Sequence, residues 1–198
     1  METWLGYFIL GFVLSTPICP VNIEMIRQGA VNGFFPSWLI GLGDVISNLL
    51  MIGIIFYGLS GWFSNAEYLA VFAIASGCYL IYLGVTNLKS YISVSLLMRP
   101  FMLLVKGFIL GLINPIDFLS WMGIYSTIQH LSPSFLVTAV IYLLIGCGTW
   151  NLVLSLSVSW CRHYLKPVFI RRFQIISGLI LGVYGVFFAW YGFNLLIE

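Results

Sequence analysis

Long apolar stretches, separated by short polar connections, make up almost the whole chain. A hydropathy window of about 19 residues, the length suited to membrane helices, marks six such stretches. They cover residues 4–33, 36–57, 68–88, 101–128, 135–160 and 173–196. A helix needs about 20 mostly apolar residues to cross a bilayer, so each stretch is long enough. The pattern predicts an all-α integral membrane protein with six transmembrane helices.

Proline interrupts the first and the fourth of these spans. The residues at the two breaks are Pro17, Cys19, Pro20 and Asn22 in the first span and Asn114, Pro115 and Asp117 in the fourth. Proline removes a backbone donor and clashes with the carbonyl four residues earlier, so each helix should break there. Non-helical backbone at membrane depth is tolerated only where protein or a water-filled cavity satisfies it. The breaks therefore predict a lined site, with a plain proline kink as the alternative.

The two halves of the chain repeat each other. Residues 72–85 match 173–186 at half of the positions, G-F-V-L at Gly11 matches G-F-I-L at Gly107, and P-S-W-L at Pro36 matches P-S-F-L at Pro133. Because each half has three spans, an odd number, the halves should have opposite orientations in the membrane. Inverted repeats with broken helices are typical of transporters that bind substrate between the halves. We predict one transporter domain, 1–198, with repeats 1–95 and 96–198; a duplication that serves structure alone is the alternative.

Composition narrows the class of protein further. Of the 198 residues, 61% are hydrophobic and 7% are charged, whereas roughly a quarter of the residues in soluble proteins are charged. This composition leaves no room for a soluble domain. The net charge of +2 is too small to predict nucleic-acid binding.

The basic residues lie around alternate connections. They are Arg27 near the first connection, Lys89, Arg99 and Lys106 around the third, and Arg162, Lys166, Arg171 and Arg172 in the fifth. Short connections rich in Lys and Arg stay in the cytoplasm. We therefore expect a multi-pass protein of the cytoplasmic membrane with both termini outside.

Three acids lie within the predicted spans, namely Glu24, Asp44 and Asp117. A carboxylate inside the bilayer is costly, so such residues usually serve an ion pathway, a proton relay or a substrate. Asp44 and Asn151 are predicted at comparable depth and can face one cavity. Glu24 precedes Arg27 by three residues, which favours an ordinary helical ion pair over a coupling role.

The remaining polar and small residues predict packing more than chemistry. The four cysteines show no CxxC or Cys/His spacing, so we predict no disulfide and no metal site. Asn48 is expected to form an interhelical hydrogen bond. Small residues four apart, as at Gly107 and Gly111, predict close helix contacts within the chain; a homodimer remains open.

Five short motifs occur in a defined order along nearly the whole chain. They are P-I-C-P-V-N at 17–22, I-R-Q-G at 26–29, G-L-G-D at 41–44, Y-L-I-Y-L-G at 79–84 and G-L-I-N-P at 111–115. This ordered set resembles the lysine exporter (LysE) and threonine/homoserine exporter (RhtB) family. The resemblance implies a small inner-membrane exporter of amino acids, driven by the proton gradient or the membrane potential.

The resemblance also implies roles for individual residues. Pro17, Pro20 and Asn22 match the first-helix signature of the family, Asp44 its second-helix acid, and Asn114 and Pro115 its fourth-helix pair. The family usually has glycine between the two prolines, where this chain has Cys19. Cys19 restricts the backbone there and leaves the choice of substrate open.

We therefore predict an amino acid exporter that is not an enzyme and needs no cofactor. Its expected partners are an amino acid, protons and the lipid bilayer. The predicted substrate-binding residues are Pro17, Cys19, Pro20, Asn22, Asp44, Asn114, Pro115, Asp117 and Asn151, with Asp44, Asp117 and Glu24 as candidates for ion coupling. We expect the N-termini of the half-helices near Pro20 and Pro115 to bind the substrate carboxylate and the acids to bind its ammonium group. The two halves would rock about this site.

Two other functions remain open from the sequence. An exporter of divalent metals could use Cys19, Asp44 and Asp117, although soft metals favour more sulfur or imidazole and neither histidine lies in a span. A membrane thiol-disulfide carrier would need two thiols that can pair, and the second break contains no cysteine.

Overall fold

The computed structural model describes residues 4–17, 19–56, 66–89, 99–128, 131–162, 164 and 167–197. Within these ranges the regular structure is helical, without a strand, which confirms the all-α class. The helices are α1 (Trp4–Leu14), α2 (Pro20–Asn32), α3 (Phe34–Ile54), α5 (Ala66–Lys89), α6 (Pro100–Leu112), α7 (Pro115–Ile128), α8 (Pro133–Cys161) and α9 (Pro167–Ile197). His130 and His163 lie outside the described residues.

Three of the described helical segments are long and apolar enough to cross a membrane alone: Phe34–Ile54, Pro133–Cys161 and Gly178–Ile197. In contrast, α1 has 11 residues, about 17 Å at 1.5 Å per residue, which is roughly half of the hydrocarbon core. The predicted first span therefore consists of α1 followed by α2, and the predicted fourth span consists of α6 followed by α7.

Both predicted helix breaks are confirmed. α1 ends at Leu14 and α2 begins at Pro20, while α6 ends at Leu112 and α7 begins at Pro115. Each proline is the first residue of its new helix, where the missing N–H costs nothing and the fixed φ suits the helix. The breaks therefore divide two predicted spans into four half-helices.

A single residue, Gly33, separates α2 from α3. Its φ of 90° belongs to the left-handed region that only glycine adopts without strain. A Cβ atom at this position would also meet the guanidinium group of Arg162 at the end of α8. The positive φ is what requires glycine here, because the exposed Arg162 side chain can move aside.

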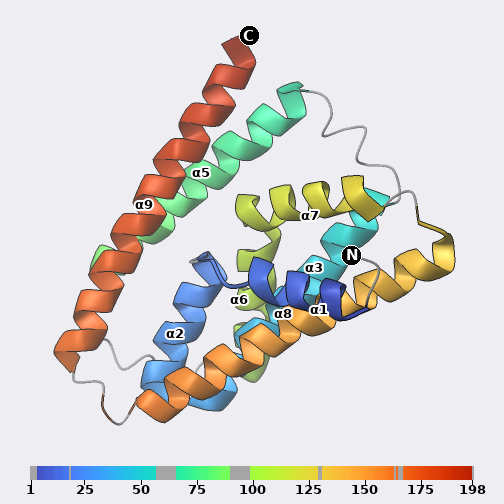
Figure 1. Ribbon diagram of the computed structural model, residues 1–198. Coiled ribbons are helices and arrows are strands. Elements are labelled where there is room, and N and C mark those ends of the chain that lie inside the picture. Colours follow the sequence, from blue (N-terminus) through green and yellow to red (C-terminus); the bar gives the residue numbers. More distant parts are fainter. Residues whose placement is uncertain are drawn as a thin grey trace.

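The closest helix contacts join the two halves of the chain. α1 packs on α8, α3 on α6, and α5 along α9 (Figure 1). Gly43 of α3 lies against the backbone of Leu104 and Phe108 in α6. Gly107 of α6 lies against the backbone of Ile40 in α3. The predicted use of small residues for contacts within the chain is confirmed at this interface.

Contacts of the same kind join α1 and α8. Gly146 of α8 lies against the backbone of Phe8 and Phe12, and Gly11 of α1 lies against the backbone of Leu143. Gly43 in the α3–α6 interface and Gly146 in the α1–α8 interface therefore occupy equivalent positions. The P-S-W-L and P-S-F-L match gives a different alignment of α3 with α8. Helix α8 has 29 residues and α3 has 21, and Gly146 lies further from the start of its helix than Gly43 does.

Helices α5 and α9 lie side by side along one side of the molecule (Figure 1). Their backbones approach closely where Gly77 meets Gly185 and where Gly84 meets Gly178. The pair contacts the rest of the molecule through a buried apolar cluster of α2, α5 and α9, made of Ile23, Leu80, Leu181 and Phe188. α7 also contacts the pair, because the ring of Phe118 lies 4.9 Å from that of Phe72 in α5, measured between ring centroids.

Basic residues of the first, third and fifth connections come together in space. Arg27 and Lys106 contact the same carboxylate, Arg162 packs on Gly33, and Arg171 donates to the carbonyl of Leu88 at 3.2 Å. We call this the basic end of the molecule.

We expect Gly43→Ala to destabilise the protein by about 1–3 kcal/mol, because the new methyl group would overlap the backbone of α6. The matched control is Gly53→Ala in the same helix, where a Cβ meets no atom within 4 Å and a gain of about 0.5–1 kcal/mol is expected. Thermal unfolding in detergent measures both. Equal melting temperatures would contradict the proposed close packing.

Candidate functional site

Asn22 satisfies the backbone that the first break leaves without helical partners. Its side-chain amide donates to the carbonyls of Ser15 and Pro17, each at 2.8 Å. Its carbonyl oxygen accepts from the indole of Trp150 at 3.4 Å. Buried carbonyl groups need such partners because an unpaired one is costly in an apolar interior. Asn22 therefore holds the broken segment in place and lies beside it.

Cys19 caps the N-terminus of α2. Its backbone has the extended conformation of an N-cap residue, its Sγ accepts from the backbone N–H of Asn22 at 3.5 Å, and its carbonyl accepts from Ile23. The N–H of Asn22, which we expected to be open to a ligand, is thus already paired. A thiol is a weak acceptor, so binding of a carboxylate at this helix end stays a prediction.

Asp44 lies on α3, 6% exposed, and faces asparagines from two helices. Its Oδ2 accepts from Asn151 of α8 at 3.0 Å and from Asn48 of its own helix at 3.4 Å. Asn48 in turn accepts from the indole of Trp121 in α7 at 2.8 Å, which confirms the predicted interhelical hydrogen bond. The carboxylate is therefore held by neutral amides, and within the described residues it makes no ion pair.

The second break places another acid at the start of α7. Asn114 is fully buried just before the helix, and its carbonyl accepts the N–H of Phe118 at 3.2 Å. Asp117 lies in the first turn, where the helix dipole favours a negative charge. This helix end therefore already carries an acidic side chain and is poorly suited to bind a second carboxylate.

Two small cavities adjoin between the half-helices and α3 and α8. They share Leu14, Ser15, Asn48 and Asp117. The first is also lined by Pro17, Cys19, Asn22, Asp44 and Asn151, and the second by Gly11, Ser120, Trp121, Ile124 and Cys147. Their volumes are about 10 and 20 Å³, room for about one water molecule each and far below the roughly 300 Å³ of a typical ligand pocket. We call the two together the polar cavity.

The structure brings most of the predicted site residues together. Six of them line the polar cavity: Pro17, Cys19, Asn22, Asp44, Asp117 and Asn151. Pro20 and Asn114 are buried at the helix starts next to it, and Pro115 begins α7. The sequence analysis gave Asn48 a packing role alone and missed the other lining residues, which are Gly11, Leu14, Ser15, Ser120, Trp121, Ile124 and Cys147. Serine, cysteine and apolar residues inside an apolar helix carry no signal of the face on which they lie.

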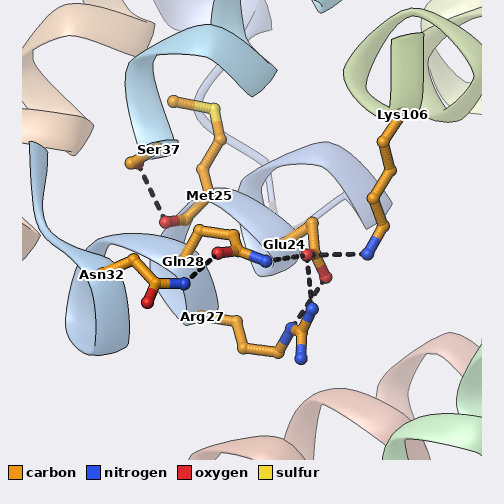
Figure 2. A network of polar contacts seen from close by, with 7 residues as sticks. All are labelled: Glu24, Met25, Arg27, Gln28, Asn32, Ser37 and Lys106. Atoms are coloured by element: carbon orange, nitrogen blue, oxygen red, sulfur yellow. Dashed lines mark hydrogen bonds and ion pairs between the residues drawn. The ribbon is translucent and has the colours of Figure 1, made fainter. Parts of the chain in front are cut away.

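Glu24 does not line the polar cavity and belongs to a separate ionic network (Figure 2). Arg27 donates to both of its carboxylate oxygens, at 2.9 and 2.7 Å, and Gln28 donates at 3.0 Å. Lys106 of α6 donates at 2.8 Å. The expected pair with Arg27 is confirmed. Lys106, which we counted among the basic residues around the third connection, lies within α6 and completes the network.

The described residues contain no group of three or more His, Cys, Asp or Glu side chains placed to hold a metal ion. The four cysteines are free thiols; Cys19 and Cys147 are buried, and Cys78 and Cys161 are exposed.

Comparison with known proteins identifies the family. A family model described as LysE type translocator matches residues 12–192. The chain belongs to the LysE type translocator family. It is also 30% identical over 215 aligned residues, covering 100% of both chains, to a Bacillus subtilis (strain 168) protein named "Putative amino acid efflux protein YcgF". No solved structure matches the present chain. This translocator is thus a membrane transport protein, and the family resemblance found in the sequence is confirmed.

We expect Cys19→Ala to destabilise this translocator by about 1 kcal/mol, because it removes the cap of α2. Cys19→Ser should keep or raise stability, because a hydroxyl oxygen is a better acceptor than sulfur. The control is Cys78→Ala, at an exposed position of α5. Melting temperatures in detergent test the order Ser, Cys, Ala; an alanine variant as stable as the parent would exclude a capping role.

Proposed function

We propose that this chain exports an amino acid from the cytoplasm, with the polar cavity as its substrate site and protonation of a carboxylate as the coupling step. The observation that carries this proposal is the meeting of Asp44 and Asp117 with three asparagines between two broken helices. Membership of a translocator family and the name of the Bacillus subtilis relative support amino acid export.

The acids are the proposed partners of the substrate ammonium group. Asp44 and Asp117 line the same part of the cavity, and a protonated amine there offsets the cost of a buried carboxylate. Asn48 and Asn151 hold the Asp44 carboxylate from two helices. A cationic group is therefore a better ligand for this end of the cavity than an anion.

The N-terminus of α2 is the proposed partner of the substrate carboxylate. The Asn22 N–H contacts the Cys19 sulfur at 3.5 Å, and a thiol is a weak acceptor that a carboxylate can displace. The helix dipole also favours a negative group at this end. Because α7 carries Asp117 at its own N-terminus, we assign the carboxylate to α2 alone, whereas the sequence suggested both helix ends.

Binding requires the cavity to open, because its present volume is too small for an amino acid. Rocking of the two halves as rigid bodies would separate the glycine contacts of α1 with α8 and of α3 with α6, where backbones touch. We propose instead that these pairs form a frame and that the half-helices α2 and α7 move. The equivalent contacts of Gly43 and Gly146 support an inverted repeat.

The proposed orientation follows from the charges. The basic end should face the cytoplasm, because short segments rich in Lys and Arg are retained there, so both termini lie outside. Export then begins with the cavity open toward the basic end. Protonation of Asp44 or Asp117 from outside would release the ammonium group by removing its counter-charge.

We expect Asp44→Asn to abolish amino acid efflux while the folded protein remains, because the amide keeps the shape but cannot bind an ammonium group or a transferable proton. Efflux from preloaded proteoliposomes against a panel of amino acids and divalent metals is the measurement. Glu67→Gln, at an exposed acid of α5, is the control. Parental efflux in Asp44→Asn would remove this residue from the site, and efflux of a metal alone would overturn the proposed substrate class.

We also expect both charged ends of the substrate to be required. The amide of the exported amino acid lacks the carboxylate, and its N-acetyl derivative lacks the ammonium group. Each analogue should compete for efflux by the parent protein much less well than the amino acid itself. Two analogues that compete as well as the parent would refute the two-ended site.

A further inference from the structure

The bond between Lys106 and Glu24 joins half-helices from opposite halves of the chain (Figure 2). α2 follows the first break and α6 precedes the second. The Glu24 side chain is 9% exposed, and Lys106 Nζ lies 2.8 Å from its Oε1. A charge-assisted hydrogen bond with so little water around it is stronger than a surface ion pair. It therefore fastens α2 to α6 at this point.

Along α2, the pair is the part of the basic end that lies nearest to the polar cavity. Along α2, Asn22 lines the cavity, Glu24 follows two residues later, and the helix ends at Asn32, next to the contact of Gly33 with Arg162. A buried apolar cluster beside the pair includes side chains of the same two helices, among them Met25. These contacts therefore close α2 against α6 on the side of the cavity that leads along α2 toward Gly33.

The rest of the network lies on α2 itself. Arg27 and Gln28 donate to the Glu24 carboxylate, and Asn32 donates to Gln28 at 2.6 Å. Within the described residues, Lys106 is the donor that comes from another helix. If α2 moves away from α6, Glu24 keeps its partners from its own helix, and Lys106, already 31% exposed, gains water. The ion pair can therefore break without leaving an uncompensated buried charge.

Both ends of α2 allow such a movement. The helix begins after the proline break, and Gly33 alone joins it to α3. Residues at the ends of elements can absorb the change of φ and ψ when a segment swings. α2 contacts its neighbours mainly through side chains, as where Gly29 meets the side chain of Val158 and Gly41 meets that of Met25. One buried hydrogen bond, from the Ser37 hydroxyl of α3 to the Met25 carbonyl at 2.9 Å, reaches its backbone (Figure 2). These contacts do not bring backbone against backbone, as those that lock α3 to α6 do.

We propose that the Glu24–Lys106 pair is the cytoplasmic gate of the polar cavity, formed when the cavity is closed to the cytoplasm and broken when α2 swings away from α6. This inference rests on the proposed function, in which α2 moves to open the cavity toward the cytoplasm. The pair then sets how often the site opens inward, while Asp44 and Asp117 bind the substrate. Neutralising one partner should populate the inward-open state without removing a substrate contact.

Cys19 is a natural reporter of that state, because it is buried in the cavity. A membrane-impermeant thiol reagent is applied to inside-out vesicles, and mass spectrometry measures the modification of each cysteine. Lys106→Met should speed modification of Cys19 by about tenfold, the effect of about 1.4 kcal/mol on a two-state equilibrium. Exposed Cys161, at the end of α8, serves as internal standard and checks that the basic end faces the reagent. In right-side-out vesicles Lys106→Met should not speed labelling of Cys19.

Two variants control the interpretation. Arg99→Met neutralises an exposed basic residue at the N-cap of the same helix and should label as the parent does, and Lys106→Arg should retain the closed state because it keeps a cationic donor. If Lys106→Met does not fold, Glu24→Gln takes its place with the same expectation.

Parental labelling of Cys19 from the cytoplasmic side would overturn the gate, as would equal acceleration from both sides, which indicates general loosening. These results do not depend on which solute is exported. Efflux of amino acids with unchanged Cys19 labelling rejects the gate alone, and faster labelling without amino acid efflux rejects the proposed substrate alone.

Discussion

The structure depends on one constraint: backbone groups that leave the helical pattern inside the bilayer must find partners within the protein. At the first break, the Asn22 side-chain amide donates to the carbonyls of Ser15 and Pro17, and Cys19 accepts from the backbone N–H groups of Asn22 and Ile23. These partners have to be polar and have to lie where the chain is broken. The residues that hydrogen-bond to the broken backbone therefore also line the polar cavity, and the candidate site lies at the helix break.

A second constraint fixes the frame around this cavity. Lipid is as apolar as a leucine side chain, so helices associate in a membrane through close packing more than through the hydrophobic effect. Gly43, Gly107 and Gly146 let backbones touch between α3 and α6 and between α1 and α8. Since each contact joins one half of the chain to the other, the rigid parts of the molecule are not its sequence repeats. The described glycines of α2 and α7 make no such backbone contacts, and in our proposal these half-helices are the parts that move.

The buried acids divide according to their partners. Glu24 is compensated by Arg27 and Lys106, so it stabilises one arrangement of two helices. Asp44 has neutral amide donors among the described residues, which hold the carboxylate without neutralising its charge. One small protein thus contains both a structural ion pair and a candidate binding carboxylate. The Glu24 carboxylate is neutralised by cations of the protein, whereas the Asp44 carboxylate is left to bind a cation from outside in our proposal.

The sequence by itself determined the all-α class, the positions of both helix breaks and the pairing of Glu24 with Arg27, because proline geometry, apolar run length and helical spacing act locally. It also placed Asp44, Asp117 and Asn151 at membrane depth, where six of the predicted site residues line one cavity. Only the tertiary structure decided that Lys106 reaches Glu24 from another helix, that Cys19 points back to cap α2, and that Trp121 and Cys147 face the cavity. These facts depend on which face of each helix meets its neighbour, and in helices that are apolar all round the sequence carries little record of that choice.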